Sequence, residues 1–199
     1  MPVYPGTDPP LFFTACSIDD VGFLEKKITM YSHTGTHIDA PAHIIQGAKT
    51  LDHLSIDHFI GKASSLNLTS IKKQAIDIPD IEPYQDLLKD SEFILLHTGW
   101  DRFWGAEEYF ASYPVLSAEA ALWLTNFRFK GLGVDTISVD ETDSNDFPIH
   151  KILLKHDMII IENLTCLHVL PNNHFMFTCF PLKIEQGDGS PVRATAIIK

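Results

Sequence analysis

The sequence predicts an α/β domain built around a mixed sheet. Segments typical of helices and of strands alternate from about residue 80 to residue 164, and this alternation favours a fold that contains parallel strands. The N-terminal third and the tail from residue 175 are richer in strand-forming residues, so the sheet is not expected to be purely parallel. The length of 199 residues and the hydrophobic content of 45% fit one domain with a complete core.

Each predicted element has its own local signal. The first ten residues are rich in proline and glycine, which indicates a loop or an extended segment. The segment 78–90 is expected to be a loop and then a helix with Glu82 and Pro83 in its first turn, and Ser117 is the N-cap candidate of a helix at 115–129. The apolar face of that second helix includes Ala121, Leu122 and Leu124. Strands are expected within 63–70, 92–100, 130–140 and 157–164, and a further short helix at 148–156.

Charge and composition exclude several classes of partner. The net charge of −11 argues against binding to nucleic acid or to an anionic membrane, because both require a basic surface. No apolar run is long enough to span a membrane, and the N-terminal segment lacks the pattern of a secretion signal. Cys16, Cys166 and Cys179 have no paired spacing, so we expect reduced, mostly buried thiols, no thiolate zinc site and a cytoplasmic location.

The stretch SHTGTHIDAPAH, residues 32–43, carries three histidines and an aspartate. His33, His37, Asp39 and His43 all have odd numbers, so an extended chain would project them to one face. A straight strand would hold His33 and His37 roughly 13 Å apart, too far to share an ion. Pro41 and Gly35 both disfavour a helix here. We therefore predict a bend near Gly35 that folds His33 back toward His37, which makes this stretch a metal or catalytic site.

A second polar cluster follows directly. It holds two Asp-His pairs, Asp52–His53 and Asp57–His58, at a spacing that does not place both on one helical face. A solvated polar face explains this cluster better than a second metal site does. In that interpretation the apolar residues of the same segment turn inward, namely Leu54, Ile56 and Phe59.

Two later residues have local signals that leave two interpretations open. Glu162 follows the apolar run MIII, so it is either a strand carboxylate that needs a cation or a solvated residue just past the strand end. His150 lies near the start of the short helix, where it is either a ligand or a surface histidine. Asp135 and Asp140 flank the segment TISV and fit either a site or a turn.

These motifs resemble the motifs of a known family. HTGTHIDAPAH closely matches the HxGTHxDxPxH signature of the cyclase-like metal-dependent hydrolases, which include bacterial kynurenine formamidases and isatin hydrolases. Further landmarks of that family follow in the same order, and they extend the resemblance over nearly the whole chain. They are MPVYPGTDPP, LLHTGW, GLGVDTISVD, PIHKILLKHDMIIIENL and LKIEQGDGSPVRATAII.

The resemblance implies a ligand set and a fold. His33, His37 and Asp39 would bind one metal, and Asp39 would bridge to a second metal held by His150 and Glu162. The implied cofactor is two divalent ions per chain, zinc first and manganese as the alternative. The implied fold is a single swivelling-type β/α domain with a mixed sheet over residues 1–199, assembled as a homodimer or homotetramer. Family members usually carry a strand before the Pro-Gly loop, and we expect either that this strand is absent or that the start of the sequence is truncated.

The implied activity is metal-dependent hydrolysis of a small amide, either an N-formyl amide or a cyclic amide. Metal-bound hydroxide would attack the carbonyl, and His43 would act as the acid/base. Aromatic side chains either line an apolar substrate pocket or pack in the core, and core packing is the commoner use; they are Phe12, Phe13, Trp100, Phe103 and Trp104. Two other functions stay open: a metal-dependent cyclase or lyase on the same site, and a non-catalytic module that binds a metal or a small molecule.

Overall fold

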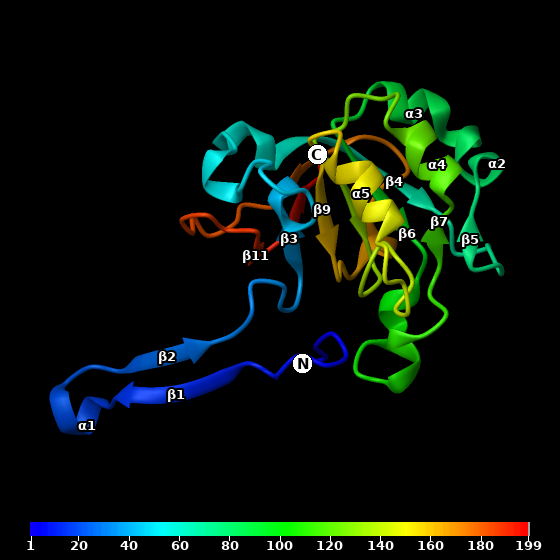
Figure 1. Ribbon diagram of the computed structural model, residues 1–199. Helices are drawn as coiled ribbons and strands as arrows, with labels where there is room; N and C mark the ends of the chain where they lie inside the picture. Colours follow the sequence, from blue (N-terminus) through cyan, green and yellow to red (C-terminus); the bar gives the residue numbers. More distant parts are fainter. Residues whose placement is uncertain (199) are drawn as a thin grey trace.

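The computed structural model describes residues 1–198 and contains one large mixed sheet (Figure 1). Its eight strands run in the order β11-β3-β9-β8-β6-β4-β10-β12. The central strands β4, β6, β8 and β9 are parallel, and the strands on either side pair antiparallel. The strands are β3 (His37–Asp39), β4 (Ile60–Asn67), β6 (Phe93–His97), β8 (Gly131–Val134), β9 (Ile159–Glu162), β10 (Phe175–Thr178), β11 (Gly189–Pro191) and β12 (Thr195–Ile197). The prediction of an α/β fold with a mixed sheet is confirmed.

The helices of the described chain are short. The α-helices are α1 (Ile18–Val21), α2 (Ile78–Ile81), α3 (Gln85–Lys89), α4 (Ala118–Leu124) and α5 (Pro148–Leu154). Single 3-10 turns lie at Pro41–His43, Leu51–His53, Ile56–Phe59, Glu82–Tyr84, Trp100–Phe103, Glu107–Phe110 and Leu167–Val169. A small parallel pair, β5 (Ala75–Ile76) and β7 (Val115–Leu116), lies beside α2 and α4 (Figure 1).

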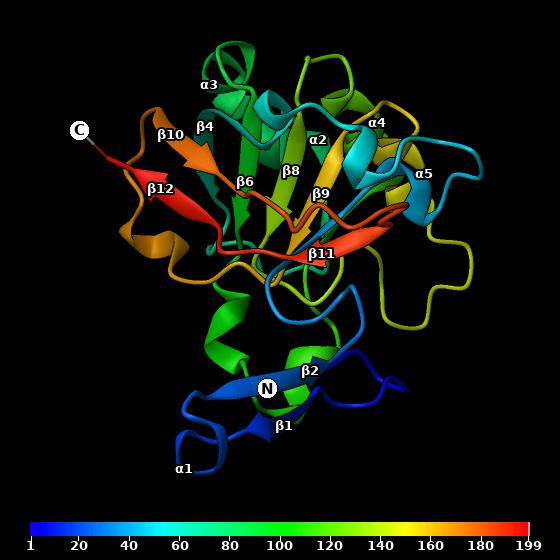
Figure 2. The same cartoon turned by 90° about the vertical axis from the view of Figure 1, so that its left-hand side faces the viewer.

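The central strands are buried on both faces, which explains their continuous apolar runs. Ile160 of β9 belongs to the core that α4 and α5 cover, through residues such as Leu124 and Leu153. Its neighbours Ile159 and Ile161 belong to the core on the opposite face. The strands β10, β11 and β12 cross in front of that second face (Figure 2). The sheet therefore encloses part of its own core, and few helices are needed to cover it.

A two-stranded arm extends away from this body (Figure 1). It consists of β1 (Leu11–Cys16), α1 and β2 (Glu25–Thr29), and its strands pair antiparallel with each other. Every residue of β2 is exposed, and β1 is exposed along all of its length except Cys16. The arm thus has no packing partner within residues 1–198.

Several predicted boundaries need correction. The helix predicted at 115–129 is shorter, because Val115 and Ser117 donate backbone hydrogen bonds to the segment that contains β5. Ser117 does cap the remaining α4, with its hydroxyl accepting from the Ala120 amide. Leu122, predicted on the apolar face, is 56% exposed.

Two further segments also differ from their predictions. The helix predicted after a loop in 78–90 begins already at Ile78, because Asp77 and Asp80 form a capping box, and it breaks into α2, a 3-10 turn and α3. The strand predicted in 130–140 ends at Val134, so TISV is not part of it. The strands within 63–70 and 157–164 and the helix at 148–156 are present as β4, β9 and α5 with shifted ends.

Two predictions about composition can be compared with the structure. In residues 1–198 no helix combines the length and the apolar character needed to cross a bilayer. The three cysteines form no disulfide, but only Cys179 is buried, and Cys166 is exposed. The expectation of mostly buried thiols was therefore wrong.

Candidate metal centre

The bend predicted near Gly35 is present and brings His33 onto β3. Gly35 has φ +67°, a left-handed conformation that glycine adopts readily. Its carbonyl accepts hydrogen bonds from His37 Nδ1 at 2.9 Å and from the Asn163 side-chain amide at 2.9 Å. The turn is thus held from both sides, and the chain before it folds back along β3.

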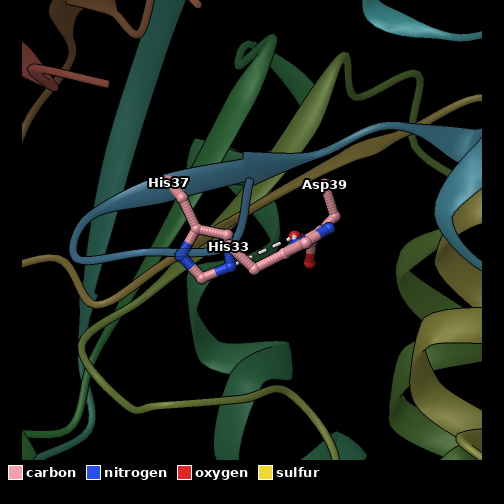
Figure 3. Close-up of side chains that lie close together, drawn as sticks. All are labelled: His33, His37 and Asp39. Carbon is pink, nitrogen blue, oxygen red and sulfur yellow. Dashed lines mark hydrogen bonds and ion pairs between the residues drawn. The ribbon is translucent and has the colours of Figure 1, made fainter. Parts of the chain in front are cut away.

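This bend places His33, His37 and Asp39 side by side (Figure 3). His33 Nδ1 lies 2.6 Å from Asp39 Oδ1, and His37 Nε2 lies 3.2 Å from the same oxygen. Ligand atoms of the three residues all lie within 4.8 Å of one another, close enough to share one ion. The prediction that His33, His37 and Asp39 form a cluster is therefore confirmed.

Strand pairing adds Glu162, and α5 adds His150. His37 of β3 is the direct antiparallel partner of Glu162 on β9, and His37 Nε2 lies 3.5 Å from Glu162 Oε2. His150 Nε2 lies 3.5 Å from both Glu162 Oε1 and Asp39 Oδ2. His150 and Glu162 are 4% and 5% exposed, which excludes the surface alternatives for both. Asp39, His150 and Glu162 form a second group able to hold an ion, and Asp39 belongs to both groups.

The buried carboxylates of this cluster need positive charge nearby to balance them. Burial alone would lower the pKa of His33, but the Asp39 and Asp188 carboxylates outweigh it and raise that pKa to about 9. Burial likewise opposes the shift at His150, whose pKa the carboxylates of Asp140, Asp39 and Glu162 raise well above its usual value. Against the cost of burial, the surrounding histidines hold the pKa of Asp39 well below its usual range. Without a cation, the histidines must therefore carry the charge that neutralises the carboxylates.

One atom tests directly whether a cation fits. Asp39 Oδ2 is buried and has no hydrogen-bond partner within residues 1–198. Burying a carboxylate oxygen without a partner lowers the stability of the fold by several kcal/mol, because the oxygen loses its hydration and gains no hydrogen bond or cation in return. This oxygen faces His150 and Glu162, and all the donors are imidazole nitrogens and carboxylate oxygens. The donor set and the unpaired oxygen fit a divalent transition metal.

His43 lies beside the cluster at the end of the 3-10 turn Pro41–His43. Its ring centroid is 4.0 Å from that of His33, and its side chain is 28% exposed. Burial lowers the pKa of His43 to about 4, so the imidazole is neutral at pH 7 and can accept a proton. It borders a cavity of about 480 Å³ that also contains His33, His37, His150 and Glu162. The apolar lining of the cavity comes from Tyr4, Tyr31, Ile44, Ile137 and Phe147.

The predicted aromatic residues do not line this cavity. Trp100 and Phe103 pack against a separate buried cluster around Tyr109 and Tyr113. Phe12 and Phe13 lie exposed on the arm, and Trp104 is 42% exposed. The favoured core-packing interpretation is confirmed for Trp100 and Phe103, and the pocket interpretation was wrong for all five residues.

The second polar cluster does not join the site. Neither Asp52–His53 nor Asp57–His58 belongs to a group in the described chain that could hold a metal. Phe59 is buried and Leu54 is half-buried, as the solvated-face interpretation requires. Ile56, however, is 72% exposed, so the prediction that it turns inward was wrong.

Sequence reasoning missed one residue near the centre. Asp188, just before β11, places Oδ2 3.1 Å from His33 Nε2 and 3.7 Å from His43 Nδ1. Its segment, GDGSP, was visible only as part of the tail landmark. The two other flanking aspartates have structural partners: Asp140 accepts from His150 Nδ1 at 2.7 Å, and Asp135 accepts from Thr98 and Gly99.

Comparison with known proteins now identifies the family. The model of a family described as "Putative cyclase" matches residues 1–141. The chain belongs to the cyclase family. A kynurenine formamidase of Bacillus cytotoxicus is 32% identical to it over 192 residues, which cover 96% of this chain and 88% of the relative.

Solved structures of similar proteins share the fold. A potential metal-dependent hydrolase with cyclase activity has a TM-score of 0.81 at 28% identity, over 98% of this cyclase-family chain and 90% of that one. An isatin hydrolase bound to the product analogue thioisatinate has a TM-score of 0.86 at 24% identity, over 96% of this chain and 82% of that one. The fold of this chain is thus shared with both structures.

Proposed function

We propose that this chain is a metal-dependent hydrolase that cleaves the C–N bond of a small non-peptide amide. The observation that carries the proposal is Asp39, a buried carboxylate shared by two ligand groups and left with one unpaired oxygen. Membership of the cyclase family and the kynurenine formamidase relatives support the same chemistry. The substrate is an N-formyl aryl amide or a cyclic aryl amide, since aromatic and aliphatic side chains line the cavity.

The residues divide into two roles. His33, His37 and Asp39 would hold one divalent ion, and Asp39, His150 and Glu162 would hold a second. Zinc or manganese suits this donor set. When bound, such an ion polarises an amide carbonyl and makes water more acidic.

His43 has the proton-transfer role in this proposal. Its neutral imidazole lies at the rim of the cluster, where it can take a proton from the attacking water and deliver it to the leaving nitrogen. It belongs to neither of the two groups that share Asp39. Transfer to the nitrogen is needed because an amide nitrogen is a poor leaving group until it is protonated.

The test is hydrolysis by the metal-loaded protein of an N-formyl aniline and of a five-membered aryl lactam, run in oxygen-18-labelled water. We expect formate release or ring opening, with one labelled oxygen in the product. A product without the label would favour the cyclase or lyase alternative. Stoichiometric metal with no turnover of either compound class would favour a binding module.

We also propose that the chain forms a homodimer through its arm, residues 11–29. The arm exposes large apolar side chains, including Phe12, Phe13, Phe23, Leu24 and Ile28, each between 51% and 60% exposed. A two-stranded ribbon is marginal in water unless it packs against something. Its exposed apolar area is on the order of several hundred Å², the upper end of what monomers usually leave uncovered, and is a large part of the roughly 800 Å² per partner that a stable interface buries.

A second copy is the partner that the chain itself suggests. The body also exposes apolar side chains in its tail, at Phe180, Leu182 and Ile184. The arm and this tail segment extend from the same side of the body (Figure 1). Two copies related by a two-fold axis could therefore each place an arm on the tail of the other, which gives a closed interface.

Light scattering after size exclusion tests the dimer. The register pairs Phe12 with Ile28, so both lie on one face of the arm, whereas Lys27 pairs with Phe13 on the other. We expect the double variant Phe12→Ser, Ile28→Ser to elute as a monomer and Lys27→Ser to remain a dimer. A wild-type protein that is monomeric at micromolar concentration would refute the assembly.

A further inference from the structure

Each of the three histidines of the cluster uses both ring nitrogens. One nitrogen faces the shared carboxylates, and the other contacts an acceptor outside the cluster. For His37 that acceptor is the Gly35 carbonyl at 2.9 Å, and for His150 it is Asp140 at 2.7 Å. For His33 it is Asp188 at 3.1 Å, a residue 155 positions away in the sequence.

The acceptor of His33 is held in place by backbone pairing. β11 pairs with β3 so that Gly189 is opposite Asp39. The Asp188 carbonyl accepts from the Ala40 amide at 2.8 Å, and the Gly187 carbonyl accepts from the Leu51 amide at 2.9 Å. Although the Asp188 side chain is half exposed, its backbone is therefore fixed on both sides.

Gly189 supports the same ring by contact. A Cβ atom at this position would lie 2.5 Å from His33 Cε1 and 2.7 Å from His33 Nε2. Real side chains do not approach this closely, so the imidazole rests directly on the glycine backbone. Two adjacent residues of the tail thus constrain one histidine by independent means, one through a hydrogen bond and one through packing.

We propose that Asp188 and Gly189 are positioning residues that set the tautomer and the orientation of His33 for metal binding. Asp188 accepts the Nε2 proton of His33, which leaves the Nδ1 lone pair directed at the site shared with His37 and Asp39. Gly189 provides the space that this ring orientation requires. The inference rests on the proposed metal centre and assigns to the distant tail a specific task in it.

The positioning role has an unequal effect on the two ligand groups. The group of Asp39, His150 and Glu162 has its own outer acceptor in buried Asp140, and the Asp188 side chain contacts His33 and His43 instead. Loss of Asp188 should therefore weaken one ion and spare the other. Loss of Asp140 should have the opposite effect.

The experiment measures zinc affinity by competition with a chromophoric chelator, together with the melting temperature of the metal-free protein. Asp188→Ala should weaken one ion about 10- to 100-fold, the usual cost of removing an outer-shell partner. Asp188→Asn should lie between this variant and the wild type, because it keeps a neutral acceptor. Gly189→Ala should weaken the same ion, and Asp140→Asn should weaken the other.

Glu185→Gln, an exposed carboxylate change in the same tail, is the matched control. Asp188→Ala should melt lower than this control in the metal-free state, because it loses the ion pair with protonated His33. A merely structural role would not weaken one ion and spare the other. Unchanged affinity for both ions in Asp188→Ala would overturn the inference. So would complete loss of one ion at saturating zinc, since Asp188 would then be a ligand itself. A wild-type protein that binds no zinc would refute the proposed function instead.

Discussion

Replacing Asp39 by alanine is expected to remove the bound metal and abolish turnover. Asp39 is 1% exposed and is the carboxylate that both candidate ligand groups contain. Its Oδ1 lies beside His33 and His37, and its unpaired Oδ2 faces His150. A metal that polarises the substrate carbonyl stabilises the transition state by several kcal/mol. Loss of that stabilisation lowers the rate at least about a thousandfold.

Metal content per chain and kcat/KM are the two measurements for this variant. Asp39→Asn, which keeps the shape of the side chain, separates loss of charge from loss of packing, and circular dichroism confirms that each variant is folded. Asp57→Asn, an exposed carboxylate of the second polar cluster, is the matched control and should retain both metal and activity. Retention of full metal content by Asp39→Ala would contradict the shared-carboxylate centre.

Replacing His43 by alanine is expected to leave the metal in place and to lower kcat by about 10²- to 10⁴-fold, the usual contribution of a general acid/base. The ring of His43 packs against His33, but His43 is not part of either group that contains Asp39. Because burial holds its pKa near 4, it is a neutral proton acceptor across the neutral range. Removing it takes away the route for the proton without removing a ligand of those groups.

The distinguishing result for His43→Ala is the combination of normal metal content with low kcat. His53→Ala, an exposed histidine of the polar cluster, serves as the control and should match the wild type. Full activity in His43→Ala would refute the acid/base assignment. Loss of metal would instead place His43 among the ligands, together with His33 and Asp188, the third group of the described chain that could hold an ion.

The sequence alone determined the part of this centre that lies within one short segment. The period of two between His37 and Asp39 and the bend at Gly35 are local properties of the backbone, so they could be predicted from spacing and residue type. The α/β class followed from the same kind of local signal, the alternation of helical and strand-like segments. Ser117 as a helix cap was confirmed for the same reason.

Only the tertiary structure decided which distant residues complete the centre. Local signals left Glu162 and His150 each with two interpretations. The pairing of His37 with Glu162 across β3 and β9 decided for Glu162, and burial of His150 against Asp39 and Glu162 decided for His150. Asp188 escaped prediction because it reaches His33 only through the pairing of β11 with β3. Which strands become neighbours depends on burying the apolar residues of the whole sheet together, and no short window of sequence contains that information.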